Sequence, residues 1–217
     1  MPTKPLLIML YGFPGSGKSY VARQLADHIQ AAHVQGDRIR NELFETPRYD
    51  KQENAVISQL MDYMSEEFLN AGISVIYDTN ALRASQRLSL RDMSRKCHAQ
   101  PLVVWLQIDA ESAFLRTQQR DRRKADDKYA PSMDRSLFDG ILTQMQNPAS
   151  TEDYVVISGK HVFSTQLSAI MKKLHDMNLI HSEDVSSGVV KPELVNLVPN
   201  PQSGRVNMAR RRNIMIR

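Results

Sequence analysis

A short glycine-rich stretch near the amino terminus constrains the fold more than any other part of this sequence. The stretch Gly12-Phe13-Pro14-Gly15-Ser16-Gly17-Lys18-Ser19 matches the pattern G-x-x-x-x-G-K-[S/T] at every fixed position. The apolar run Leu6–Tyr11 precedes it, and residues 18–32 follow with apolar side chains at helical spacing. A continuous apolar run of this length indicates a buried strand. A strand, a glycine turn and a helix in this order predict a phosphate-binding loop, or P-loop.

The residue types of this loop each have a chemical reason. Glycines let the backbone curl so that successive N–H groups face phosphate oxygens, and the helix N-terminus adds a positive dipole end. The Lys18 ammonium is expected to reach the β- and γ-phosphates, and the Ser19 hydroxyl is expected to ligate Mg²⁺. The sequence therefore predicts ATP and Mg²⁺ as ligands. We assign ATP binding to Gly12, Gly15, Ser16, Gly17, Lys18 and Ser19.

Apolar runs alternate with helical patterns along the rest of the chain. Strands are expected at 73–77, 101–108 and 154–157, with His33-Val34 as a further candidate, and helices at 51–71, 84–97, 111–123, 133–146 and 165–177. Such alternation is typical of a parallel sheet covered by helices on both faces. We therefore expect an α/β fold with a doubly wound parallel sheet, a P-loop NTPase of nucleoside-monophosphate-kinase-like architecture.

The regular pattern stops near Glu183, which suggests a P-loop kinase domain over residues 1–182 and a basic extension over 183–217. Residues 191–217 contain six lysines and arginines against Glu193 alone, so the body of the chain is close to neutral. A basic tail suits nucleic-acid phosphates. The apolar residues within it suit docking onto the body or a partner instead.

Cysteine content and hydropathy bear on where the protein works. The sequence has one cysteine, Cys97, so no internal disulfide can form. No stretch approaches the roughly 20 apolar residues that a membrane-spanning helix needs. We expect a cytoplasmic protein without membrane contact.

Two acidic positions follow the second and third candidate strands. Asp37 and Arg40 come shortly after His33-Val34, and Asp78-Thr79-Asn80 directly follows the run 73–77. The carboxyl ends of parallel strands meet at the ligand-binding edge of a sheet. Asp37 is suited there to accept the proton of an attacking hydroxyl, and Asp78 to hold the metal or orient the acceptor. A helix N-cap for Asp37 and an Asx turn for Asp78 are the structural alternatives.

Several arginines cluster in the candidate helix 111–123. Arg116 and Arg120 lie four residues apart, a spacing that places both on one helical face, and Arg123 follows three residues later. Guanidinium groups stabilise charge on a phosphoryl group during its transfer. A solvated basic face is the structural alternative. We assign catalytic roles to Lys18, Asp37, Arg120 and Arg116.

The P-loop, the Asp37-x-x-Arg40 pair and Asp78-Thr79-Asn80, with Arg87 following, resemble the phage-type 5′-hydroxyl polynucleotide kinases and the P-loop kinases grouped with them. Zeta-toxin-like sugar-nucleotide kinases are more distant relatives. The resemblance covers about residues 6–158. It implies that Asp37 is the general base, that Arg40 contacts an acceptor phosphate and that Asp78 serves the acceptor and metal side. We expect the acceptor to contact Arg40, Asp78, Asn80 and Arg87.

We expect from these features an ATP-dependent phosphotransferase that moves the γ-phosphoryl group to a hydroxyl. The acceptor stays open between a nucleic-acid 5′-hydroxyl and a small metabolite or sugar nucleotide. A nucleotide-gated ATPase that binds RNA or a partner is the alternative from another class. The Asp37-x-x-Arg40 pair separates these classes, because a transferase requires a base and a simple nucleotide switch does not.

Overall fold

The protein folds around one parallel sheet, seen in a computed structural model that describes residues 2–121, 123 and 127–180. The extension expected at 183–217 lies outside these residues. The five strands lie in the order β2-β3-β1-β4-β5, and every neighbouring pair is parallel. The strands are β1 (Leu6–Gly12), β2 (Ala32–Gln35), β3 (Val75–Asn80), β4 (Gln100–Gln107) and β5 (Tyr154–Ser158).

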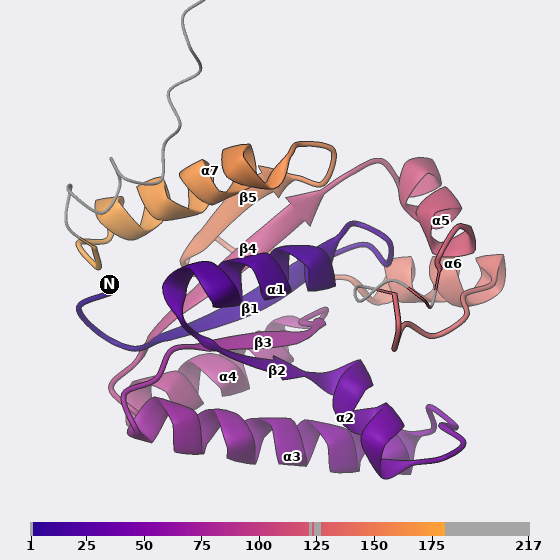
Figure 1. The fold of residues 1–217 in the computed structure, drawn as a ribbon, viewed down its shortest axis with the longest axis horizontal. Coiled ribbons are helices and arrows are strands. Elements are labelled where there is room, and N and C mark those ends of the chain that lie inside the picture. Colours follow the sequence, from indigo (N-terminus) through magenta and orange to yellow (C-terminus); the bar gives the residue numbers. More distant parts are fainter. Residues whose placement is uncertain (1, 122, 124–126, 181–217) are drawn as a thin grey trace, which may run out of the picture.

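Helices cover both faces of the sheet, with α1 and α7 on one face and α3 and α4 on the other (Figure 1). The helices are α1 (Lys18–Ile29), α2 (Gly36–Leu43), α3 (Lys51–Asn70), α4 (Ala84–Lys96), α5 (Ala110–Gln118), α6 (Arg135–Gln144) and α7 (Phe163–Asp176). This arrangement confirms the expected α/β fold with a doubly wound parallel sheet.

The central strand β1 shows why the apolar run near the amino terminus has no polar residue. Side chains of a strand point alternately to the two faces of its sheet. Leu6, Ile8 and Leu10 accordingly pack under α1 and α7, and the residues between them pack under α3 and α4. All of these side chains are fully buried. Because both faces of β1 are covered, both sets must be apolar.

Some elements differ from the sequence-based expectation. The short candidate strand at His33-Val34 is confirmed as part of β2, and the helix α2 follows it, a position where the sequence offered a helix only as the structural alternative for Asp37. The helix expected over 111–123 ends at Gln118, so Arg120 comes from the segment after α5. Within the described part of the chain, no helix combines the length and apolar character required to span a bilayer.

Candidate active site

A cavity of about 490 Å³ lies at the carboxyl edge of the sheet. The P-loop forms one wall, between the end of β1 and the start of α1. Residues from the ends of β2 and β3 and from the region of α5 complete it. Among the residues that line it are Lys18, Ser19, Asp37, Asp78, Asn80, Arg116 and Arg120. Most of the residues assigned from the sequence are thus brought together in one place.

Glycines are required where the P-loop packs closely against its surroundings. A Cβ atom on Gly12 would lie 2.5 Å from the carbonyl oxygen of Leu106. On Gly15, which has a φ of +81°, it would lie 2.2 Å from the carbonyl oxygen of Ala113. Both approaches are to backbone, so no side-chain rotation can relieve them. These glycines allow the loop to pack against β4 and α5.

Lys18 lies against the P-loop, where its Nζ donates hydrogen bonds to the carbonyl oxygens of Gly12 at 3.0 Å and Phe13 at 2.8 Å. Burial lowers the pKa of this ammonium to about 8, against an opposing effect of Asp78. Its close partners are neutral, so an incoming phosphate would be its first tight ionic contact. The buried Ser16 hydroxyl also has no hydrogen-bond partner among the described residues. Both observations fit a site for phosphate oxygens.

Two side chains with oxygen atoms, those of Ser19 and Asp78, lie together at one side of the cavity. The Ser19 hydroxyl lies 3.3 Å from Asp78 Oδ1, and the second carboxylate oxygen lies 2.9 Å from His33 Nε2. No three His, Cys, Asp or Glu side chains gather as a ready-made metal site in the described ranges. A hydroxyl and a carboxylate fit Mg²⁺, which keeps several waters and takes further ligands from phosphates.

His33 was not singled out by the sequence, where it had no metal-site spacing. The structure gives it a defined place, since β2 lies beside β3 and brings its imidazole to Asp78. Asn80 braces the loop from the same side. Its amide donates to the Gly12 carbonyl oxygen at 2.7 Å, and its Oδ1 accepts from the Gly12 N–H at 3.3 Å.

Asp37 lies in the first turn of α2, and its carboxyl group lines the cavity. It is not the helix N-cap, a position that Gln35 occupies. Burial, and then the charge of Asp78, raise the pKa of Asp37 to about 6, although Arg40, Arg120 and Lys18 lower it. A carboxylate with a pKa near neutrality is suited to general-base chemistry.

The two arginines that were assigned catalytic roles both reach the cavity. Arg116 Nη1 donates to the carbonyl oxygen of Gly159 at 2.8 Å, and Arg120 Nη1 donates to that of Pro131 at 2.7 Å. Burial lowers the pKa of Arg120. Both donate to neutral carbonyl oxygens, so a phosphate can take these N–H groups without breaking an ion pair. The exposed Arg123 does not line this cavity.

Arg40 is placed differently from the expectation. It is buried, and its guanidinium pairs with Glu53, donates to Asn54 Oδ1 at 2.7 Å and lies 4.5 Å from the centre of the Tyr49 ring. Its charge is thus neutralised inside the protein. Only its Nε has no hydrogen-bond partner among the described residues. Arg40 lines a second cavity next to the first one.

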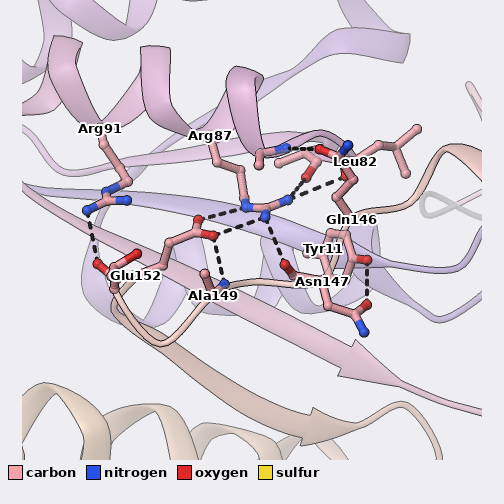
Figure 2. Close-up of polar contacts among 11 residues, drawn as sticks. Tyr11, Leu82, Arg87, Arg91, Gln146, Asn147, Ala149 and Glu152 are labelled. Atoms are coloured by element: carbon pink, nitrogen blue, oxygen red, sulfur yellow. Dashed lines mark hydrogen bonds and ion pairs between the residues drawn. The ribbon is translucent and has the colours of Figure 1, made fainter.

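The acceptor contact expected for Arg87 is corrected by the structure. Its side chain is 0% exposed and forms a bidentate pair with Glu152, at 2.7 and 3.0 Å. Figure 2 shows the remaining donors directed at backbone carbonyls, among them those of Leu82 and Asn147. The guanidinium also lies 5.3 Å from the centre of the Tyr11 ring. Arg87 therefore joins α4 to β1 and to the segment before β5, away from the cavity.

Solved structures share this fold over most of their length. A gluconokinase from Sinorhizobium meliloti 1021 is 18% identical, with a TM-score of 0.58, over 80% of this chain and 93% of its own. Kti12 from Chaetomium thermophilum, solved with ADP-AlF3, is 17% identical, with a TM-score of 0.63, over 81% and 99%. APS kinase from Mycobacterium tuberculosis, solved with AMPPNP and APS, is 17% identical, with a TM-score of 0.57, over 80% and 99%.

At these identities the likeness shows a common fold, that of P-loop kinases. A comparison with curated protein sequences finds no match. The model of one protein family, described as AAA domain, matches residues 7–138. This match runs from β1 through the P-loop, Asp37, Asp78, Arg116 and Arg120 into α6, and it covers more than half of the chain. The chain therefore belongs to the AAA domain family and has a P-loop kinase-like fold.

Proposed function

We propose that this protein is an ATP-dependent phosphotransferase that transfers the γ-phosphoryl group to a hydroxyl. One observation carries the proposal: a single cavity holds the P-loop, a carboxyl group with a raised pKa and two arginines that donate hydrogen bonds to neutral carbonyl oxygens. Nucleotide binding alone requires the loop but not the base. The bound ADP-AlF3 of Kti12 and the bound AMPPNP of APS kinase support ATP as the donor.

The residues divide the work in this proposal. The loop amides and Lys18 hold the triphosphate, while Ser19 and Asp78 hold Mg²⁺. When bound, that ion neutralises charge on the phosphate oxygens. Asp37 accepts the proton of the attacking hydroxyl, and Asn80 keeps the loop in position. Arg116 and Arg120 stabilise the transferring group, so catalysis is mainly positioning and electrostatic stabilisation.

We propose a small-metabolite acceptor in place of the nucleic-acid 5′-hydroxyl that the resemblance to polynucleotide kinases implies. The two arginines expected to contact the acceptor, Arg40 and Arg87, are paired with Glu53 and Glu152. Gluconokinase and APS kinase, which share the fold, are named for small acceptors. A nucleotide-gated ATPase remains the alternative from another class, and it would not require Asp37.

The test is incubation with γ-labelled ATP, Mg²⁺ and a panel of 5′-hydroxyl DNA and RNA, nucleosides, sugars and sugar acids. We expect label to appear on at least one hydroxyl acceptor. Asp37→Asn should lower transfer by about a hundredfold or more, the range for a lost general base, while ATP still binds. Asp27→Asn, on the exposed side of α1, is the matched control. Near-full transfer by Asp37→Asn would show that the base is wrongly assigned.

A further inference from the structure

A second cavity, of about 590 Å³, lies directly beside the phosphate-binding one. Asp37, Thr79 and Leu82 line both cavities, so the proposed base stands where the two meet. The second cavity lies between α2, α3, the start of α4 and the end of α6. A hydroxyl bound in this second cavity would lie next to Asp37 and face the phosphate side. This is the geometry that an acceptor requires.

The charges along this second cavity are few. Arg40 is neutralised by its ion pair with Glu53. Arg83 is exposed, and its Nη2 donates to the neutral Gln144 Oε1 at 2.8 Å. Among the described residues, no carboxylate pairs with Arg83. Apart from the Asp37 carboxyl group, the other polar side chains that line it are amides and hydroxyls, from Asn54, Ser58, Thr79, Ser85, Gln86 and Gln144.

This lining is unlike a surface for nucleic acid. Proteins that bind single strands combine several phosphate contacts with aromatic rings on which bases stack. The described residues that line the second cavity include no aromatic side chain, and Arg83 is their single cation without an acidic partner. Amides and hydroxyls instead match the donors and acceptors of a polyol.

We propose that the second cavity binds a small polyhydroxylated acceptor with one anionic group, carboxylate or phosphate, held by Arg83. The inference rests on the proposed phosphotransferase function. An acceptor hydroxyl oxygen forms a bond to the γ-phosphorus, and the bond from that phosphorus to the β–γ bridging oxygen breaks. The hydroxyl proton passes to the Asp37 carboxylate, and ADP leaves. Arg83 determines specificity and takes no part in the chemical step.

Matched acceptor pairs test the anionic group. With γ-labelled ATP, xylonate is compared with xylitol, ribose 5-phosphate with ribose, and both pairs with a 5′-hydroxyl decanucleotide. A charge-assisted hydrogen bond should raise kcat/KM for the anionic member at least about tenfold over its neutral partner. The two pairs also separate a carboxylate from a phosphate as the preferred group.

Variants of Arg83 test whether this residue causes the preference for the anionic acceptor. Arg83→Gln should raise KM for the preferred anionic acceptor by about tenfold or more, with kcat nearly unchanged, and should leave KM for its neutral partner unaltered. Arg83→Lys should restore part of the difference. Arg91→Gln is the control, because Arg91 lies half-buried on α4, the helix that follows Arg83, donates to the Thr151 carbonyl oxygen and lies outside both cavities. The Arg83 side chain makes no capping hydrogen bond to α4, so the fold should tolerate these changes.

Each outcome is decisive. Preference for an anionic polyol that is lost in Arg83→Gln and kept in Arg91→Gln supports the inference. Transfer mainly to the decanucleotide, or equal transfer to charged and neutral partners, overturns it and leaves the phosphotransferase function intact. No transfer to any acceptor, with ATP bound, overturns both.

Discussion

The two cavities that meet at Asp37 hold their positive charges in different ways. On the phosphate side, Lys18, Arg116 and Arg120 donate their hydrogen bonds to backbone carbonyls, which carry no formal charge. On the acceptor side, Arg40 is buried in an ion pair with Glu53. An anion can bind the N–H groups of Lys18, Arg116 and Arg120 without breaking an ion pair. An anion that bound Arg40 would have to separate it from Glu53, which costs free energy. The comparison teaches that a cationic residue near a site contributes to binding only if its charge is available.

The largest effect is expected on the phosphate side. Arg120→Ala should lower the rate of phosphoryl transfer by about a thousandfold, as for other arginines that stabilise this reaction. ATP affinity should fall much less, because the loop and Lys18 still hold the nucleotide. Arg123→Ala, exposed and outside the cavity, is the matched control in steady-state kinetics with labelled ATP. Equal rates for the two variants would contradict the role of Arg120.

Removing one partner of a buried ion pair should instead lower the stability of the fold and leave substrate binding unchanged. Arg87→Met leaves the Glu152 carboxylate buried without its partner, which should cost about 3 to 5 kcal/mol in the free energy of unfolding. The double variant Arg87→Met, Glu152→Gln should recover part of this loss. Urea unfolding measures both. If Arg87→Met keeps full stability but raises KM for an acceptor, Arg87 contacts substrate after all.

Asp37, which lines both cavities, should lower the stability of the fold when its carboxyl group is ionised. Its pKa of about 6 in the folded state lies above the ordinary 3.8, so the folded protein binds this proton more tightly. Stability should therefore fall as pH rises through the range between these values. Asp37→Asn should stabilise the protein at pH 8 by up to about 3 kcal/mol and have little effect near pH 3.5. A destabilised Asp37→Asn at pH 8 would contradict the burial of this charge.

The smallest effect is expected at His33, which holds Asp78 but does not line the cavity. His33→Ala should weaken the apparent Mg²⁺ affinity of transfer by about tenfold, as for other residues that orient metal-bound groups. His33→Gln should recover part of it, since an amide can donate to the carboxylate. His28→Ala, exposed on α1, is the control in a magnesium titration of the rate. An unchanged titration in His33→Ala would show that Asp78 needs no support.

The parts of the site that the sequence predicted are local or sit at strand ends. The P-loop is one contiguous motif, and its neighbours β1 and α1 follow from periodicity alone. Asp37 and Asp78 could be placed because parallel strands bring their carboxyl ends to one edge. The contact between His33 and Asp78 could not be predicted, because it requires β2 to pair with β3. The sequence of neither strand indicates which strand it pairs with.

The sequence did not predict the contacts of two arginines whose partners lie elsewhere in the chain. Arg87 is one of several arginines at four-residue spacing on α4, and spacing does not tell which of them faces the interior. Its partner Glu152 lies 65 residues away. The resemblance implied that Arg40 contacts an acceptor phosphate, and nothing in its own motif indicates the pairing with Glu53. Arg116 and Arg120 both lie at the cavity. They do not share a helical face as expected, because α5 ends at Gln118 and Arg120 lies beyond it.

Calorimetric titration of the folded protein with ATP and Mg²⁺ tests the central claim most directly. The account predicts one nucleotide per chain, bound at the P-loop, and a loss of about a hundredfold in affinity for Lys18→Met, from removal of a buried charge-assisted contact. Lys51→Met, at the exposed start of α3, should bind as the unaltered protein does. Absence of binding, or equal affinity in Lys18→Met, would contradict the claim that this loop holds a triphosphate.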